Sequence, residues 1–284
     1  MRIAAAVILY NPDEEVIHNI CSYINNVETI YVLDNTEEPK EELINKLTAL
    51  PKTIYLNDGE NQGIAVRLNQ ASHLAITSGF EWLLTMDQDS YFDQADINNY
   101  VTCISLFKKI SEISMFGVEY ETKTTQSEEC RPYEVEQLIT SGSILNLAAF
   151  KIAGRFDEAL FIDEVDLDYC YNSITKGFKI IQFKNIFLNH SLGKVSYRKS
   201  LKNLKSTPRT LHSPIRVYYM IRNFLYVNAK YRKNFKLDKR RRKKALLTRL
   251  KNNFLYGSNR LLLIRLIFEA FSDYKNGRMG KKPF

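Results

Sequence analysis

Short runs of β-branched and aromatic residues alternate with helical patterns over the first 120 residues of the chain. Three segments between these runs, 13–26, 40–50 and 63–79, have the apolar spacing and the flanking Asn, Pro or Gly of helices. This order is typical of a mainly parallel sheet with helices on both faces. The expected fold class is therefore α/β, with strands at 2–10, 29–34, 53–57, 80–87 and 113–119.

The middle of the chain continues this pattern after one interruption. Segment 121–136 is polar and acidic and is expected to form a mobile loop. Residues 138–183 then predict a strand, a short helix, an acidic loop, a helix and a final strand. A chain of 284 residues with 45% hydrophobic content is long enough for one large domain with an appendage.

Polar residues follow each of the first four predicted strands. Ligands of parallel sheets bind at the carboxyl ends of the strands, so these side chains are expected to share one rim. A loop-to-helix entry, "NDGENQGIAVRLN", adds Gly63, which allows close backbone approach, and a helix N-terminus that suits an anion. Arg67 lies one turn inside that helix. The rim residues are Asn11, Asp34, Asn35, Asn57, Asp58, Asp87 and Asp89.

Asp87 and Asp89 end the apolar run "WLLTMDQDS" and point the same way if the strand continues through them. Two carboxylates so close repel each other unless a cation lies between them, and hard oxygen ligands suit Mg²⁺ or Mn²⁺. Taken alone, such a pair is more often an acidic turn that caps the next helix. The metal interpretation therefore depends on the other residues of the rim.

A second acidic cluster, "FIDEVDLDYC", contains Asp163, Glu164, Asp166 and Asp168. One carboxylate facing the rim would suit general-base work on a hydroxyl nucleophile. The alternative is a helix N-terminus carrying acids that stabilise the helix dipole. His190, after the last predicted strand, is either a ligand of a metal or phosphate or an ordinary polar residue at a strand end.

The net charge of +8 hides a division along the chain. Residues 1–175 contain 11 Lys or Arg and 29 Asp or Glu, whereas residues 176–284 contain 29 and 3. The basic part includes "KRRRKK" and the amphipathic run "NRLLLIRLIFEAF", a combination typical of an anchor on an anionic membrane surface. Nucleic acid binding is disfavoured because no known motif is present. An ordinary solvated face is the third alternative.

These features predict an α/β domain at 1–212 and a basic helical region at 213–284. No secretion signal is evident at the start, and Cys21, Cys103, Cys130 and Cys170 have no ligand-like spacing. We therefore expect reduced thiols in a cytoplasmic protein that lies peripherally on the inner face of the plasma membrane. The oligomeric state stays open.

Seven motifs in order resemble the family 2 glycosyltransferases, which are inverting enzymes with the GT-A fold. They are "AAVILYNP", "YVLDN", "NQGIAVRLN", "MDQDS", "SGSILN", "GRFDEALFIDEVDLDYC" and "NHSLG". Within that family, "DQDS", "FID.VD", "H.LG" and "SPIRVYYMIRN" are similar to the rhamnosyltransferase group. The resemblance covers roughly residues 3–226.

The resemblance implies a role for individual residues. Asp166 is the implied catalytic base, and Asp87, Asp89 and His190 are the implied ligands of Mg²⁺ or Mn²⁺. The chain departs from the family at Val165, where Glu is usual, and at Asn172, where Arg is common. The implied donor-binding residues are Tyr10, Asn11, Asp34, Asn61, Gly63, Arg67, Asp87 and Gln88, and those on the acceptor side are Ser141, Gly142 and Asp163.

The implied activity is metal-dependent transfer of L-rhamnose from dTDP-rhamnose to a growing cell-surface polysaccharide on a lipid carrier. One alternative uses the same chemistry with galactofuranose or a hexose from a UDP donor. The other is a non-catalytic protein that binds nucleotide sugars or a membrane surface.

Overall fold

The computed structural model describes residues 1–120, 129–190, 195–199, 206–257 and 259–283. Its contacts divide the chain into two units. The N-terminal unit contains Met1–Glu158 and Val165–Ser191, and the C-terminal unit contains Ala159–Glu164 and Leu192–Phe284. The expected boundary between residues 212 and 213 differs from this division, because a short central segment and a hairpin associate with the C-terminal helices.

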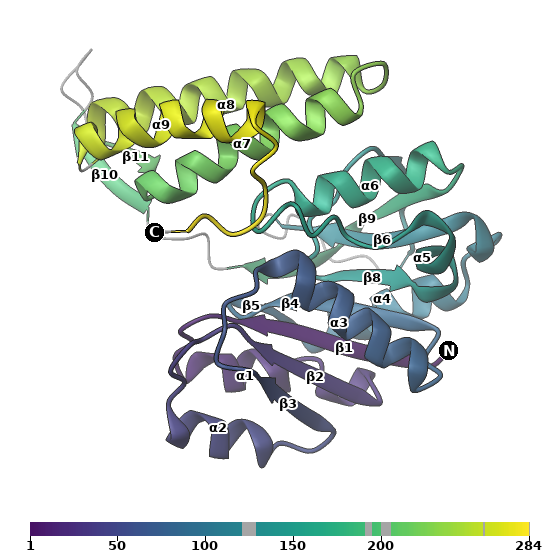
Figure 1. The fold of residues 1–284 in the computed structure, drawn as a ribbon. Coiled ribbons are helices and arrows are strands. Elements are labelled where there is room, and N and C mark those ends of the chain that lie inside the picture. The colour runs from purple at the N-terminus through teal and green to yellow at the C-terminus, as the bar shows by residue number, and fades with distance from the viewer. Residues whose placement is uncertain (121–128, 191–194, 200–205, 258, 284) are drawn as a thin grey trace. The chain divides into compact units, whose positions relative to one another are not determined.

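The described residues of the N-terminal unit build a nine-stranded sheet in the order β3-β2-β1-β4-β8-β6-β9-β5, with β7 paired to β9 (Figure 1). The pairs β3–β2, β2–β1 and β1–β4 are parallel, whereas β8 runs antiparallel to β4 and β6. The strands are β1 (Ile3–Leu9), β2 (Thr29–Asp34), β3 (Thr53–Asn57), β4 (Trp82–Asp87), β5 (Ser90–Phe92), β6 (Ile113–Glu119), β7 (Pro132–Val135), β8 (Ser143–Asn146) and β9 (Lys179–His190).

Helices cover both faces of this sheet (Figure 1). Side chains alternate along β1, so that Ala5, Val7 and Leu9 join a core with α1, α2 and α4, while Ala4 and Ala6 face the other side. Helix α3 packs against β1, β2 and β4, and α5 and α6 pack against β8, β6 and β9. The helices are α1 (Glu15–Cys21), α2 (Glu41–Thr48), α3 (Ile64–Thr77), α4 (Gln94–Ser105), α5 (Leu147–Ala153) and α6 (Val165–Thr175).

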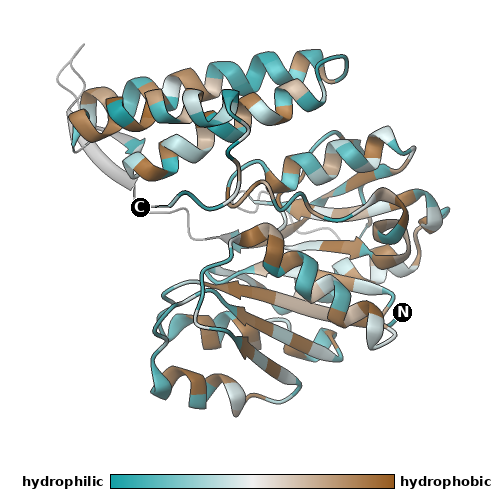
Figure 2. Ribbon diagram, in the orientation of Figure 1, coloured by the Kyte–Doolittle hydropathy of each residue, from teal (hydrophilic) through white to brown (hydrophobic). Residues whose placement is uncertain are grey.

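The strands and helices expected from the sequence agree closely with those observed. Figure 2 shows the hydrophobic residues concentrated on the strands, which is the pattern that made them recognisable. The expected loop at 121–136 is wrong in its last part. Residues 121–128 lie outside the described residues, and Pro132–Val135 form β7, because their backbone pairs antiparallel with β9.

The expectation of four reduced cysteines is also wrong. Cys103 at the end of α4 and Cys130 before β7 form a disulfide, with their Cα atoms 5.5 Å apart. They are 27 residues apart in the chain, and only the folded sheet brings them together. Cys21 is exposed and free, and Cys170 is buried and free.

The C-terminal unit combines a hairpin with three helices. The hairpin pairs β10 (Val195–Lys199) with β11 (Ser206–Thr210), and the helices are α7 (Pro214–Lys230), α8 (Lys236–Tyr256) and α9 (Arg260–Lys275). Its core joins Val217 and Ile221 of α7 to Leu263, Leu266 and Ala270 of α9. Among the described helices, none is long and apolar enough to cross a membrane.

Candidate active site

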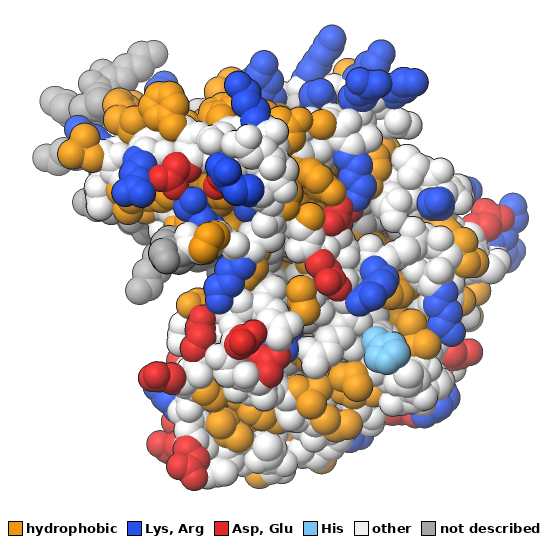
Figure 3. Space-filling model, viewed as in Figure 1, with side chains coloured by type: hydrophobic (Ala, Val, Ile, Leu, Met, Phe, Trp, Pro, Cys, Tyr) orange, Lys and Arg blue, Asp and Glu red, His pale blue; other side chains and the backbone are white. Residues whose placement is uncertain are grey.

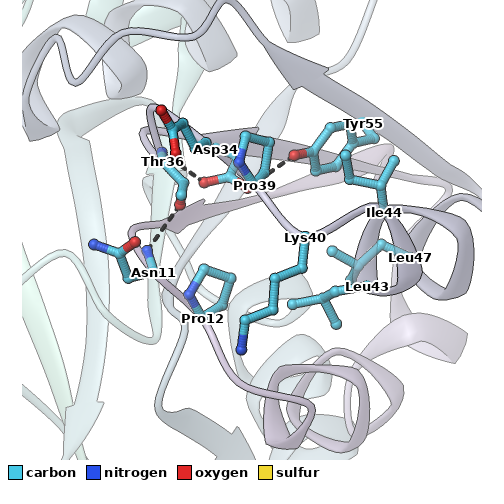
Figure 4. A pocket seen from close by; sticks show the side chains of 11 residues that line it. Asn11, Pro12, Asp34, Thr36, Pro39, Lys40, Leu43, Ile44, Leu47 and Tyr55 are labelled. Carbon is cyan, nitrogen blue, oxygen red and sulfur yellow. Dashed lines mark hydrogen bonds between the residues drawn. The ribbon is translucent and has the colours of Figure 1, made fainter.

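A pocket of about 300 Å³ lies where β1 and β2 end, beside α2 (Figure 4). One wall is polar and is built around Asp34, which is 2% exposed. Its carboxylate accepts hydrogen bonds from Thr36 N and from the Tyr55 hydroxyl, each at 2.8 Å. Burial, together with the hydrogen bond to Asp34, raises the pKa of Tyr55, so the phenol keeps its proton and donates it.

The rest of the pocket is shaped by Asn11 and by α2. Asn11 adopts a left-handed conformation (φ 47°), which Asn tolerates well, and its N–H donates to Thr36 Oγ1 at 2.8 Å. Helix α2 contributes Leu43, Ile44 and Leu47 as an apolar wall. A polar edge opposite an apolar wall suits a flat ring that carries hydrogen-bonding groups on one side.

Arg67 braces the loop beside this pocket. Its side chain is 1% exposed, and its guanidinium donates to Asn35 Oδ1, to both carboxylate oxygens of Asp58 and to Glu60 O. The hydrogen bonds from Arg67 lower the pKa of the Asp58 carboxyl. This geometry does not support the expected contact of Arg67 with a donor phosphate, because the guanidinium is buried and directed at the protein.

Gly63 stands at the N-terminus of α3 with a φ of 86°, a conformation that favours glycine. Asn61 Oδ1 accepts the Gly63 N–H at 3.1 Å, so Asn61 shapes the turn before the helix. Among the described residues, no side chain caps this helix. Its first N–H groups are therefore suited to an anion, as the sequence predicts.

The turn from β4 to β5 carries Asp87 and Asp89, both partly exposed. Gln88 between them bonds the end of β1, since its Oε1 accepts Tyr10 N at 2.8 Å and its Nε2 donates to Tyr10 O at 3.3 Å. Asn19 Nδ2 donates to Gln88 O at 2.8 Å. Gln88 therefore holds the β4–β5 turn against the end of β1. The sequence did not predict this supporting role, and the expected contact of Gln88 with the donor stays a prediction.

The carboxylates of this turn fit a divalent cation in type, because Mg²⁺ and Mn²⁺ prefer oxygen ligands. Within the described part of the chain, no three His, Cys, Asp or Glu side chains form a group able to hold a metal. The backbone of His190 pairs with Ser90, directly after Asp89. The side chain of His190 lies outside the described residues, so its role as a ligand stays a prediction.

Three consecutive residues, Thr140, Ser141 and Gly142, connect the β4 turn to Asp166. Ser141 Oγ accepts Asp87 N at 3.2 Å and donates to Ser90 Oγ at 2.9 Å, and Thr140 Oγ1 donates to Asp166 Oδ1 at 3.2 Å. Gly142 has a φ of 71°, and a Cβ there would lie 2.8 Å from Leu188 Cδ2. Ser141 is fully buried, so its side chain supports the site from within the protein.

Tyr120 was missed at the sequence level. Its hydroxyl donates to Ser141 O at 2.9 Å, and burial followed by the charges of Asp166 and Asp87 raises its pKa. Tyr120 therefore contacts the same segment, Thr140–Gly142, that contacts Asp87 and Asp166, although 79 residues separate the two carboxylates in the chain. The signal was present, because Tyr120 directly follows the strand at 113–119 and so belongs to the same class of position as Asn11 and Asp34.

Asp163 and Asn172 are the remaining residues that the sequence singled out. Asp163 belongs to the C-terminal unit, where it forms an ion pair with Arg216 at 3.1 Å. Its place on the acceptor side stays a prediction. Asn172 Nδ2 donates to Ala153 O at 2.6 Å and thereby fastens α6 to the end of α5, which explains an Asn at that position.

Comparisons with known proteins agree with this architecture. No family model matches the chain. It is 25% identical over 240 residues to the dTDP-rhamnosyl transferase RfbF of Shigella flexneri, covering 78% of each chain. The structure of S. aureus TarS 1-349 in complex with UDP-GlcNAc matches with a TM-score of 0.56 and 16% identity, covering 96% of this chain and 80% of that one.

A second solved structure, GalNAc-T7 with UDP, GalNAc and Mn²⁺, matches with a TM-score of 0.61 and 11% identity over 97% of this chain. The chain spans 56% of that structure and 44% of a longer TarS structure. The fold of this chain is therefore the GT-A fold of these glycosyltransferases. In sequence, the chain is similar to a rhamnosyltransferase, which agrees with the resemblance of its motifs to the rhamnosyltransferase group of the family 2 glycosyltransferases.

Proposed function

We propose that this chain is an inverting glycosyltransferase that moves L-rhamnose from dTDP-rhamnose to a hydroxyl of a growing cell-surface polysaccharide on a lipid carrier. The observation that carries the proposal is that the neighbouring residues Thr140 and Ser141 contact Asp166 and Asp87, respectively. One carboxylate at a cation site and a second carboxylate nearby are the two charged groups that inverting transfer needs.

The donor is assigned to the rim of the N-terminal unit. The pocket beside Asp34 receives the base, with its polar edge toward Asp34 and Thr36 and its face against the apolar wall of α2. Asp87 and Asp89 would hold Mg²⁺ or Mn²⁺ together with the donor diphosphate, with His190 as the third ligand that the motifs imply. When bound, this cation stabilises the negative charge of the departing nucleotide.

Asp166 is assigned as the general base. It takes the proton of the acceptor hydroxyl while that oxygen forms a bond to the anomeric carbon of the sugar. The bond from this carbon to the β-phosphate oxygen breaks, and the electron pair leaves with the nucleoside diphosphate. Thr140 orients the carboxylate by donating a hydrogen bond to Oδ1.

The test of this proposal is donor turnover by Asp166→Asn. Asparagine keeps the shape of the side chain and accepts the Thr140 hydrogen bond, but it cannot take a proton. We expect the release of dTDP from dTDP-L-rhamnose to fall by about 100-fold or more, with the affinity for dTDP unchanged. Equal turnover by the wild type and the variant would remove Asp166 from the mechanism.

Similarity to RfbF supports the rhamnosyl donor. The same geometry accommodates galactofuranose or a hexose from a UDP donor, because the described pocket recognises the base and not the sugar. TarS, which shares the fold, was solved in complex with UDP-GlcNAc, and this makes a UDP donor the second candidate here. The remaining alternative is a non-catalytic protein that binds nucleotide sugars or a membrane surface, and such a protein would release no dTDP in the turnover assay.

The acceptor side involves a membrane in this proposal. One face of α8 carries Arg240, Lys243, Lys244 and Lys251 around Leu247, along an open groove of about 380 Å³. Helix α9 exposes Leu261 (83%), Phe268 (71%) and Phe271 (44%). Figure 3 shows Lys and Arg side chains gathered over these C-terminal helices with hydrophobic ones between them. Cations beside exposed apolar side chains fit an anionic leaflet, such as the inner face of a plasma membrane.

A further inference from the structure

Six residues from the middle of the chain, Ala159–Glu164, belong to the C-terminal unit. Both ends of this segment continue into the N-terminal unit, since Glu158 precedes it and Val165 follows it. Ala159 O accepts the Gly280 N–H at 2.9 Å, and the Phe161 ring stacks on Tyr219 of α7 with 5.3 Å between centroids. The first half of the segment is therefore fastened to α7 and to the chain after α9.

Helix α7 also holds the second half. Asn223 is fully buried, and its Nδ2 donates to Ile162 O at 2.6 Å and to Asp163 O at 3.1 Å. Arg216 donates to both carboxylate oxygens of Asp163, at 3.3 and 3.1 Å. Arg216, Tyr219 and Asn223 are spaced three and four residues apart, so they share one face of α7. The motif "SPIRVYYMIRN" therefore supplies the three side chains of α7 that hold the segment Ala159–Glu164.

Helix α8 supplies the last contact, an ion pair between Arg242 and Glu164 with 2.6 Å between Nη2 and Oε2. The two side chains are only 13% and 18% exposed, so solvent screens their attraction weakly. The Arg242 guanidinium also lies over the Phe224 ring of α7, 5.2 Å from its centroid. Removing one partner would leave a mostly buried charge.

The contacts hold an unfavourable backbone conformation. Asp163 and Glu164 have φ angles of 62° and 67°, in the left-handed region that residues with a Cβ avoid. Each such residue costs about 1 kcal/mol or more, and the conformation persists only where the surroundings enforce it. Here the enforcing groups are Arg216 and Asn223 of α7 and Arg242 of α8.

Glu164 is joined by a peptide bond to Val165, the first residue of α6, and Asp166 is the second. We propose that Arg216, Asn223 and Arg242 are positioning residues, through which the C-terminal helices set the start of α6 and thereby the place of Asp166. This inference rests on the proposed function of Asp166 as the base. It assigns the basic helix α8 a second role beside its exposed face, carried by Arg242, which pairs with Glu164 of this segment.

The test compares Arg242→Gln with Arg241→Gln, its exposed neighbour on α8, which removes the same charge from the same helix. Both are assayed at pH 8 with dTDP-L-rhamnose and Mg²⁺. We expect Arg242→Gln to lower kcat by about 10-fold to 100-fold with KM within twofold of wild type, because Asp34 and Asp87 are untouched. Arg241→Gln is expected to match wild type. Arg242→Lys keeps the charge and is expected to recover part of kcat.

Hydrogen exchange of peptides covering 159–170 provides a second measurement that needs no activity. Exchange is expected to be faster in Arg242→Gln and in the isosteric Glu164→Gln than in Arg241→Gln. Unchanged exchange together with unchanged kcat would overturn the positioning role, and so would a loss confined to KM. If Asp166→Asn turns over normally while exchange at 159–170 still responds, the assigned base has failed and the anchoring of the segment has not.

Discussion

At the scale of single residues, the pocket depends on a buried carboxylate with an assigned partner for each oxygen. Asp34 is 2% exposed, with Thr36 N on one oxygen and the Tyr55 hydroxyl on the other. A buried acceptor that loses its donor costs about 1–3 kcal/mol. The two hydrogen bonds hold the Asp34 carboxylate in one orientation. A ligand that binds beside Asp34 then meets a fixed polar edge.

Tyr55→Phe tests this arrangement. We expect the free energy of unfolding to fall by about 1–3 kcal/mol and the affinity for dTDP to fall as well, because Asp34 Oδ2 loses its donor. Tyr31→Phe is the matched control, since Tyr31 lies on β2 and bonds Ser78 at 3.1 Å, away from the pocket. Denaturant unfolding and calorimetric titration with dTDP provide the two readouts. Equal dTDP affinity in both variants would contradict the role of Tyr55.

The charge of Glu164 depends strongly on its surroundings. Burial raises its pKa from 4.5 to about 7, against the opposing effect of Arg242; Asp163 and Asp238 raise it further, and Arg249 lowers it. A carboxyl with a raised pKa in the folded state binds its proton more tightly there than when unfolded. Its contribution to stability is therefore complete below pH 4.5 and is lost as pH rises through 7.

Glu164→Gln removes this titration. We expect the stability of the variant relative to wild type to increase from about pH 5 to about pH 8, measured by thermal unfolding at several pH values. Glu41→Gln changes an exposed carboxyl at the start of α2 and is expected to leave the pH dependence unaltered. Parallel curves for wild type and Glu164→Gln would show that Glu164 has an ordinary pKa.

At the scale of elements, the basic side chains of α8 point in two directions, one toward the protein and the other toward solvent. Arg242 points inward to Glu164, whereas Arg240, Lys243 and Lys244 line the open groove. Near an anionic leaflet each exposed cation contributes about 1 kcal/mol. The exposed face therefore supplies attraction to a membrane, while the inward arginine holds the segment before α6.

Neutralising Arg240, Lys243 and Lys244 to Gln tests the exposed face. We expect binding to vesicles that contain phosphatidylglycerol to weaken by about 100-fold, and binding to purely phosphatidylcholine vesicles to stay weak throughout. Lys108, Lys109 and Lys151 changed to Gln remove the same charge from the N-terminal unit and are expected to bind like wild type. Co-sedimentation measures both. If both triple variants lost the same vesicle affinity, the attraction to the membrane would depend on the net charge of the protein and not on the exposed face of α8.

At the scale of the whole molecule, the donor can be identified without knowing the acceptor. A ligand present at about 100 times its Kd stabilises the native state by about 2.7 kcal/mol. We expect dTDP-L-rhamnose with Mg²⁺ or Mn²⁺ to raise Tm by several degrees, more than UDP-galactofuranose or UDP-hexoses, and chelation of the metal to reduce the shift. A larger increase in Tm with a UDP sugar would identify that sugar nucleotide, and not dTDP-L-rhamnose, as the donor.

Local patterns in the sequence predicted the elements well and their long-range partners less well. The strands and the rim residues Asn11, Asp34 and Asp87 follow from hydrophobic runs that end in polar residues, which is a local signal. The Cys103–Cys130 disulfide, the pairing of β7 and the inward direction of Arg67 depend on contacts between distant segments. Tyr120 was overlooked because a tyrosine after a strand is unremarkable until its neighbours are known.

The central segment Ala159–Glu164 has a consequence for how this chain can be divided. The backbone passes between the two units after residue 158, after residue 164 and after residue 191. A truncation that removes the C-terminal helices would expose Phe161 and leave Glu164 without Arg242. The separated helices would in turn lack the segment Ala159–Glu164, which packs against them. No single cut yields two intact halves, so the helical unit is an integral part of the protein rather than an interchangeable anchor.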